Sequence, residues 1–189
     1  MFKDPILKKL HKKYGPHKFE DRSEKLYEEL ISSIISQQLS NKAADTIYNR
    51  FLSLFKGKKH PASKELLKID SEKLRSAGMS YSKASYIKNI AAAFENRELE
   101  IKEIKKMTDE EIIKELTKIK GVGKWTAEMT LIFTLQREDI FSLGDAGLKR
   151  AIKNLYNLEK DADILKLSEN WKPYRSYACW YLWRSLEND

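Results

Sequence analysis

Two glycines, a lysine and a tryptophan follow Ile119 in the stretch IKGVGKWTAEM, a combination that could bring the backbone close to a phosphate. A Walker loop has the pattern G-x-x-x-x-G-K-[ST] after a strand, and a dinucleotide-binding loop has G-x-G-x-x-G after a strand. Here Gly121 and Gly123 lie between two helical patterns, and Trp125 stands where the Walker hydroxyl residue would follow Lys124. The stretch is therefore not typical of a nucleotide-binding loop.

The order helix, x-G-x-G, helix is typical of a helix-hairpin-helix. The two glycines would let the turn pack closely and would expose backbone N–H groups at the start of the second helix. Those groups, together with the positive end of the helix dipole, can hold one DNA phosphate without reading its base. A tight corner between two helices that binds no ligand is the alternative.

A second candidate is Asp145, in the stretch IFSLGDAGLKRAI, twenty residues after Trp125. An aspartate between a glycine and a helical pattern is usually an N-cap. A carboxylate can also stabilise developing positive charge or activate a water molecule. The spacing alone leaves both interpretations open.

Helical periodicity dominates the elements that would position these residues. Apolar residues recur every three or four positions over 26–35, 43–54 and 84–94. Ser23 is a candidate N-cap of the first helix, and the second helical stretch begins at Ser40. Thr108 and Glu111 stand at capping-box spacing and predict a helix start. We find no alternating strand pattern and no internal repeat, and we expect an all-α fold of roughly ten helices, with Pro173 in the first turn of the last one.

The composition narrows the class of protein. The 189 residues carry 36 Lys and Arg against 28 Asp and Glu, a net charge of +8, which favours contact with a polyanion such as nucleic acid. The single cysteine, Cys179, excludes an intramolecular disulfide, a four-cysteine cluster and an iron–sulfur cluster. No apolar run approaches the ~18 residues of a membrane span, and we expect an intracellular, monomeric protein with no membrane contact.

Four segments, in order, resemble the helix-hairpin-helix DNA glycosylase superfamily, most closely 3-methyladenine DNA glycosylase II. They are ISSIISQQLSNKAADTIYNRF, GMSYSKASYIKNIAAAF, LTKIKGVGKWTAEM with the later IFSLGDAGLKRAI, and the terminal WKPYRSYACWYLW. The resemblance covers about residues 25–186. It implies a monofunctional enzyme of base excision repair that flips alkylated purines, of the 3-methyladenine and 7-methylguanine type, out of double-stranded DNA and hydrolyses the N-glycosidic bond.

The resemblance assigns a catalytic role to Asp145, because the aspartate of the family falls on it. Glycosylases that also nick the strand carry a Schiff-base lysine on the helix after the hairpin. The matching position here is Trp125, and Lys124 lies about 100° away around a helix. The resemblance therefore implies base removal by water without a lyase step.

Base recognition is implied for a further set of residues. A flipped base leaves a gap that a side chain fills, and the family places this DNA wedge at Gln38, with Leu39 as the second choice; a surface pair at a helix end is the alternative for QQ. Cationic alkylated purines are attracted to indole faces. Trp125 and Trp183 match pocket tryptophans, and Met129 stands where some members have tyrosine. Without the resemblance, Trp183 is more typical of a helical core.

The resemblance also implies contacts along the hairpin. Gly121 and Gly123 would bind the DNA backbone, with Lys120, Lys124 and Lys149 as phosphate neighbours, although each lysine alone is typical of any surface. No cofactor is required. The backbone carbonyls of Thr117, Ile119 and Val122 match a site that holds Na+ or K+ in this superfamily.

The expected architecture is a single glycosylase domain over residues 1–189, without an N-terminal β domain. Two helical lobes would surround a cleft that contains Asp145. Lobe A is expected over about 31–115 plus the hairpin 116–130, and lobe B over about 1–30 and 131–189. Two alternatives remain: a non-catalytic protein that binds damaged DNA, and a glycosylase for another lesion, such as hypoxanthine, ethenoadenine or uracil.

Overall fold

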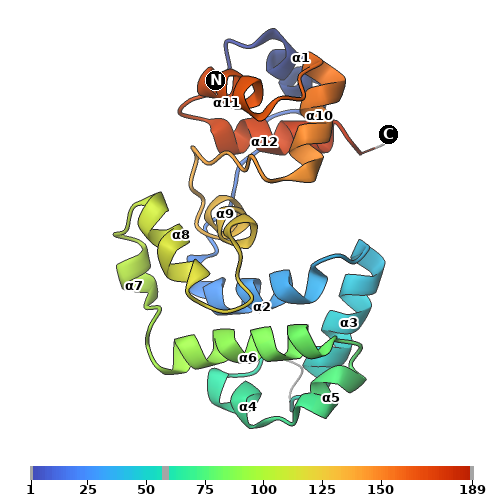
Figure 1. The fold of residues 1–189 in the computed structure, drawn as a ribbon, viewed down its shortest axis with the longest axis vertical. Coiled ribbons are helices and arrows are strands. Elements are labelled where there is room, and N and C mark those ends of the chain that lie inside the picture. Colours follow the sequence, from blue (N-terminus) through green and yellow to red (C-terminus); the bar gives the residue numbers. More distant parts are fainter. Residues whose placement is uncertain (1, 57–59, 188–189) are drawn as a thin grey trace. The chain divides into compact units, whose positions relative to one another are not determined.

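The computed structural model describes residues 2–56 and 60–187, and every regular element in these residues is a helix (Figure 1). The all-α prediction is confirmed. The α-helices are α1 (Pro5–Tyr14), α2 (Leu26–Ser36), α3 (Asn41–Ser53), α4 (Ser63–Lys68), α5 (Ser71–Ser76), α6 (Tyr81–Glu95), α7 (Ile101–Ile104), α8 (Asp109–Thr117), α9 (Lys124–Phe133), α10 (Ala146–Tyr156), α11 (Asp161–Glu169) and α12 (Arg175–Arg184), with a short 3-10 helix, η1 (Ser23–Lys25), before α2.

The chain divides into two units. Unit 1 combines the residues up to Asp21 with those from Leu131 onward, and unit 2 spans Arg22–Thr130. Unit 1 thus contains α1, α10, α11 and α12, and unit 2 contains η1 and α2 to α8. The boundary between residues 130 and 131 falls inside α9. The other boundary lies between residues 21 and 22, whereas the sequence analysis expected the first segment of lobe B to end at about residue 30.

The core of unit 2 forms where α2 packs against α3 and α6, and α6 in turn packs against α4 and α5 (Figure 1). The apolar stripe of α2 is fully buried there, including Leu30, Ile31 and Ile34, and Ile87 and Ile90 of α6 are buried too. Burying one such side chain contributes about 1.5–3 kcal/mol. These contacts fix α2, whose C-terminal end precedes the candidate wedge residues Gln38 and Leu39.

Unit 1 is assembled around α12, which packs against α1 and α10. Asp4 ties three parts of this unit together. One carboxylate oxygen accepts the N–H of Leu7, which caps α1, and the hydroxyl of Tyr156 at the end of α10. The other accepts the indole N–H of Trp171 at 3.4 Å. Burial, followed by the nearby Asp4 charge, raises the pKa of Tyr156, so its hydroxyl stays protonated as the donor.

Several predicted helix boundaries can be compared with the structure. The capping box of Thr108 and Glu111 is confirmed, with bonds in both directions, and Ser40 caps α3. The N-cap prediction for Ser23 is wrong: Ser23 is buried in η1, and α2 begins only at Leu26. Pro173 also precedes α12, which begins at Arg175, instead of lying in its first turn.

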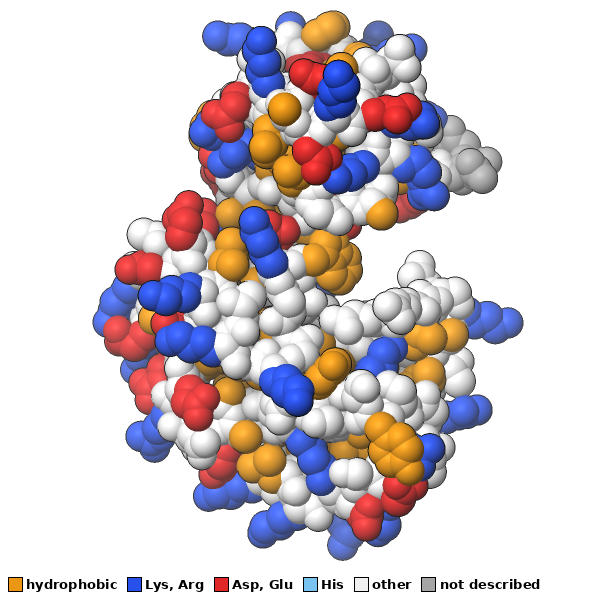
Figure 2. Space-filling view, in the orientation of Figure 1, with side chains coloured by type: hydrophobic (Ala, Val, Ile, Leu, Met, Phe, Trp, Pro, Cys, Tyr) orange, Lys and Arg blue, Asp and Glu red, His pale blue; other side chains and the backbone are white. Residues whose placement is uncertain are grey.

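The structure adds three helices that we did not expect individually, α1, α7 and α11. α7 has only four residues, and α1 and α11 are rich in charged residues. Figure 2 shows that Lys and Arg side chains are spread among Asp and Glu on the visible face. Among the described residues, no helix combines the length and the apolar character needed to cross a membrane.

Candidate active site

Asp145 is the N-cap of α10, and its carboxylate is oriented by two donors. Its Oδ1 accepts the backbone N–H of Leu148 at 2.7 Å and the indole Nε1–H of Trp183 at 2.9 Å. Asp145 is only 8% exposed. The capping interpretation from the sequence is therefore correct as geometry, and it does not compete with a chemical role, because the cap bond and the indole bond together hold the carboxylate in one orientation.

Gly147, in the first turn of α10, makes room for this arrangement. A Cβ at this position would lie 3.0 Å from Asp145 Oδ1 and 3.2 Å from Cδ1 of Trp183. Both distances are tighter than ordinary van der Waals contact, so a larger residue would displace the indole or the carboxylate. The sequence analysis did not single out Gly147. A glycine in a helical first turn, two residues after a candidate carboxylate, was the available signal.

Trp183 also contacts Phe133, the last residue of α9, with ring centroids 5.6 Å apart. The Phe133 ring is 42% exposed and packs edge-on against Phe19. Since large aromatic side chains usually lie in the core, a half-exposed ring next to the indole that binds Asp145 marks a surface suited to an aromatic ligand. The sequence analysis did not identify Phe133 as a candidate residue.

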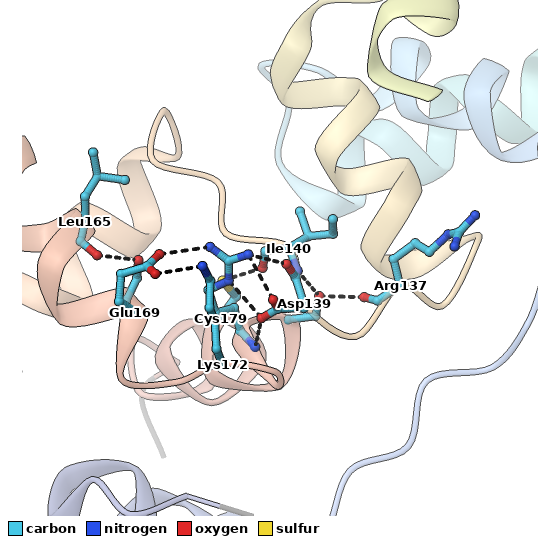
Figure 3. A network of polar contacts seen from close by, with 10 residues as sticks. Arg137, Asp139, Ile140, Leu165, Glu169, Lys172 and Cys179 are labelled. Carbon is cyan, nitrogen blue, oxygen red and sulfur yellow. Dashed lines mark hydrogen bonds and ion pairs between the residues drawn. The ribbon is translucent and has the colours of Figure 1, made fainter. Parts of the chain in front are cut away.

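The loop from Arg137 to Ile140, which leads toward Asp145, is held by the start of α12 (Figure 3). The hydroxyl of Ser176 donates to the carbonyl of Arg137 at 2.6 Å and accepts the N–H of Ile140 at 3.0 Å. The Ser176 N–H donates to the carbonyl of Glu138. One buried serine therefore satisfies three backbone groups of the loop.

Arg175 adds an ion pair to the same loop. Its guanidinium donates to both carboxylate oxygens of Asp139, at 2.8 and 3.0 Å, and to the Asp139 carbonyl at 2.9 Å. Glu169 lies on the other side of the guanidinium, and Lys172 pairs with Glu169 (Figure 3). In the sequence analysis the WKPYRSYA segment had a role only through the resemblance. In the structure its Arg175 and Ser176 hold the loop that precedes Asp145.

The two hairpin glycines have different structural roles. Gly121 has a φ of +109°, and a Cβ there would fall 2.2 Å from Cγ of Tyr86 on α6, so both its conformation and its packing require glycine. Gly123 is exposed, and a Cβ there would meet nothing within 4 Å. The packing of the fold therefore does not require a glycine at position 123.

The helix that follows the hairpin presents the residues expected to face a base. In α9, Trp125 is 41% exposed and Met129 is half-buried one turn later. They are four residues apart and lie on one face of the helix. Lys124 pairs with the buried carboxylate of Glu128 at 3.7 Å. Within their own units, Asp145 and Trp183 are brought together in unit 1, whereas Trp125 and Met129 belong to unit 2.

The candidate wedge residues lie directly after α2. Gln38 is exposed with a φ of +58°, in the left-handed region that side chains other than glycine rarely adopt. Leu39 is also exposed, and its N–H donates to the Ser36 carbonyl. A strained, exposed turn at a helix end is a feature found at functional sites.

The hairpin carbonyls form a chemically suitable set for a monovalent cation. Thr117 ends α8, where helix carbonyls lack partners further along the helix. The Ile119 carbonyl accepts the N–H of Val122 at 2.9 Å and keeps a second lone pair. Among the lysines assigned to phosphate, Lys120 is exposed, whereas the ammonium of Lys149 pairs with Asp161 at 2.6 Å.

Comparisons with known proteins show what the chain is similar to. The family model described as HhH-GPD superfamily base excision DNA repair protein matches residues 31–175. The chain is 39% identical to DNA-3-methyladenine glycosylase 1 of Schizosaccharomyces pombe, over 95% of this chain and 80% of that protein. It is also 39% identical to the alkylbase DNA glycosidase-like protein mag2 of the same yeast, over 93% of this chain and 85% of that protein.

A solved structure extends the likeness to three dimensions. The S. pombe 3-methyladenine DNA glycosylase in complex with abasic DNA superposes with a TM-score of 0.86 at 38% identity. The match covers 97% of this chain and 92% of that one.

The two hairpin glycines give the first prediction. Gly121→Ala should lower the free energy of unfolding by on the order of 1–3 kcal/mol, because it combines a strained φ with an overlap on Tyr86. Gly123→Ala should change it by less than about 1 kcal/mol. Urea unfolding followed by circular dichroism measures both. Equal stabilities for the two variants would contradict the different roles.

A second prediction concerns the indole of Trp183. Gly147→Ala should move the Nε1–H resonance of Trp183 in a nitrogen–proton NMR spectrum, because the new methyl group pushes the indole away from Asp145. Trp183→Phe assigns the resonance. Gly144→Ala is the matched control, since a Cβ there meets nothing within 4 Å. An unshifted resonance in Gly147→Ala would disprove the close-approach argument.

Proposed function

The chain belongs to the HhH-GPD superfamily of base excision DNA repair proteins, and we propose that it is a DNA-3-methyladenine glycosylase that removes alkylated purines from genomic DNA. The reaction hydrolyses the N-glycosidic bond and leaves an abasic site. The observation that carries this proposal is the carboxylate of Asp145, held at the start of α10 by Leu148 and by the indole of Trp183.

Removal of an alkylated purine does not require a strong general acid. An alkylated purine such as 3-methyladenine is cationic, so when its bond to C1′ breaks, the base leaves with the electron pair as a neutral molecule. Positive charge then develops on the deoxyribose. The Asp145 carboxylate stabilises that charge and accepts a proton from the water that attacks C1′. The cap bond keeps Asp145 in place throughout, because it uses the backbone of the same helix.

Aromatic side chains suit the cationic base. An indole face attracts a cation by about 0.5–2 kcal/mol beyond simple burial. In unit 1, the ring of Phe133 lies beside Trp183. In unit 2, Trp125 is exposed on α9 and Met129 follows one turn later. Each of these two pairs, within its own unit, offers apolar and aromatic surface suited to a flipped purine.

The residue at 125 also supports a reaction without strand cleavage. A lyase step needs a lysine amine that attacks C1′, and Trp125 has no nucleophile. Lys124 is one residue earlier, about 100° around α9, and its ammonium pairs with buried Glu128. An amine held as a charged ion pair is a poor nucleophile. Water is therefore the nucleophile that we propose.

DNA contact rests on the hairpin. The first turn of a helix has backbone N–H groups without partners in the helix, and α9 begins directly after exposed Gly123. We place one backbone phosphate there, with Lys120 beside it. Gln38, or Leu39 next to it, fills the gap left by the base.

The third prediction tests the activity directly. Duplex DNA that contains 7-methylguanine or 3-methyladenine should release free base when incubated with the protein, as measured by chromatography. Asp145→Asn should lower the single-turnover rate by on the order of 100-fold or more, because it removes the charge that faces the reaction. No release of any alkylated base by the wild type would overturn the proposed function.

The same assay contains two controls. The strand should break only after added alkali, and cleavage without alkali would contradict the monofunctional mechanism. Duplexes that contain hypoxanthine, ethenoadenine or uracil test the other lesions. Tight binding of damaged DNA without release of any base would identify a non-catalytic binding protein instead.

We further propose that the carbonyls of Thr117, Ile119 and Val122 hold K+ or Na+. Carbonyl oxygens are neutral ligands that suit a monovalent cation. The Lys120 carbonyl, between them in the sequence, accepts the side-chain amide of Asn89 at 2.9 Å, which holds this turn against α6. A bound cation would fix the turn and add positive charge near the phosphate.

The fourth prediction follows from this cation site. Replacing K+ by tetramethylammonium at constant ionic strength should weaken binding to an abasic duplex by about threefold or more, and should lower the midpoint of thermal unfolding. The larger ion cannot enter a carbonyl site, whereas its general screening is the same. Identical affinity and identical unfolding in both salts would disprove the site.

A further inference from the structure

The C-terminal end of α2 is held by a lysine from another helix. Lys83, in the first turn of α6, donates to the carbonyl of Ile35 at 2.8 Å and to the carbonyl of Gln37 at 2.6 Å. The last four carbonyls of a helix have no partners further along the helix. Lys83 therefore supplies the acceptors at the end of α2 with a charged donor, which binds about twice as strongly as a neutral one.

A second contact holds the same turn through a side chain. The amide Nε2 of Gln37 donates to the hydroxyl of Thr126 at 3.2 Å. Thr126 is buried in the first turns of α9, the second helix of the hairpin. Gln37 is thus bound at three points, because its N–H also donates to the Ser33 carbonyl within α2.

The contacts to Gln37 hold the backbone next to Gln38 and involve no atom of Gln38 itself. Gln38 follows Gln37 with its side chain exposed and its φ at +58°. Residues other than glycine rarely adopt the left-handed conformation, and it persists only where its surroundings impose it. The contacts from α6 and α9 provide that constraint on the residue before it.

We propose that Lys83 is a positioning residue for base flipping, which acts by locking the end of α2 so that the Gln38 turn is already shaped for insertion into the duplex. The proposal rests on the proposed function for its substrate. An unlocked turn would have to be ordered at the moment of insertion, and that cost would fall on the flipping step. Burial lowers the pKa of Lys83, as is typical of a lysine committed to contacts inside the protein.

The alternative role for a lysine in a DNA-binding protein is a contact to phosphate. Both short bonds of Lys83 go to carbonyls within unit 2, and its side chain is half-buried. A phosphate contact would instead be lost uniformly on every duplex and would reduce the salt dependence of binding. This difference separates the two roles in an experiment.

The experiment compares two substrates and four proteins. One duplex has 7-methylguanine paired with cytosine, and the other has it unpaired in a single-nucleotide bulge, where flipping costs less. The proteins are the wild type, Lys83→Met, Lys83→Arg and Lys88→Met. The last is the matched control, because Lys88 on the same helix also donates to a carbonyl, that of Ile69 at 2.6 Å.

Lys83→Met should lower the single-turnover rate on the paired lesion by about tenfold, and on the bulged lesion by less than about threefold. Lys83→Arg should recover most of the loss, because it restores a charged donor. Lys88→Met should show no difference between the two substrates. An equal loss on both substrates, or no loss on either, would overturn the proposal.

A second measurement does not depend on hydrolysis. A duplex with 2-aminopurine next to an abasic-site analogue should become more fluorescent when the wild type or Lys88→Met inserts a side chain, and less so with Lys83→Met. If the wild type releases no base but still gives this signal, the proposed function fails and the role of Lys83 stands. If Lys83→Met does not fold, Gln37→Met removes the contact to Thr126 and should give the same substrate pattern. An equal effect of Gln37→Met on both substrates would then contradict the proposal.

Discussion

The backbone groups that a helix leaves unpaired at its ends are the constraint on which this structure depends. Three parts of the candidate site lie at such ends. Asp145 caps the start of α10, the proposed phosphate position is the start of α9, and Gln38 follows the end of α2. A helix end must find donors or acceptors from elsewhere. The fold meets this need partly with its own side chains, and DNA would meet the rest.

The carboxylate of Asp145 both caps a helix and binds an aromatic side chain. Its Oδ1 accepts both the helix N–H of Leu148 and the indole N–H of Trp183. The first bond stabilises α10, typically by about 1 kcal/mol, and the second orients an aromatic surface. Stability and chemistry therefore share the same atom, and a change at either donor alters both.

The features that the sequence predicts correctly are those set by residues close together in the chain. The capping box at Thr108 follows from spacing alone, and the all-helical fold, including a helix start near Ser40, follows from apolar periodicity. The N-cap prediction for Ser23 was wrong because a 3-10 turn, which has no distinct signal, precedes α2. The contacts of Lys83, Ser176 and Gly147 join segments far apart in the chain or depend on an indole from another helix. No spacing along the sequence contains that information.

The two chain ends share unit 1, whereas unit 2 lies between them in the sequence. A ribosome that makes this protein therefore completes unit 2 while α1 still lacks its partners. Tyr181 of α12, which donates to the carbonyl of Gly15 and packs on Phe2, is made after all of unit 2. Since domains fold as units during synthesis, we expect the hairpin turn and the Gln38 turn to form before the indole of Trp183 binds the Asp145 carboxylate. A chain truncated before α12 would keep the residues of the hairpin and of the Gln38 turn and lose the indole that orients Asp145.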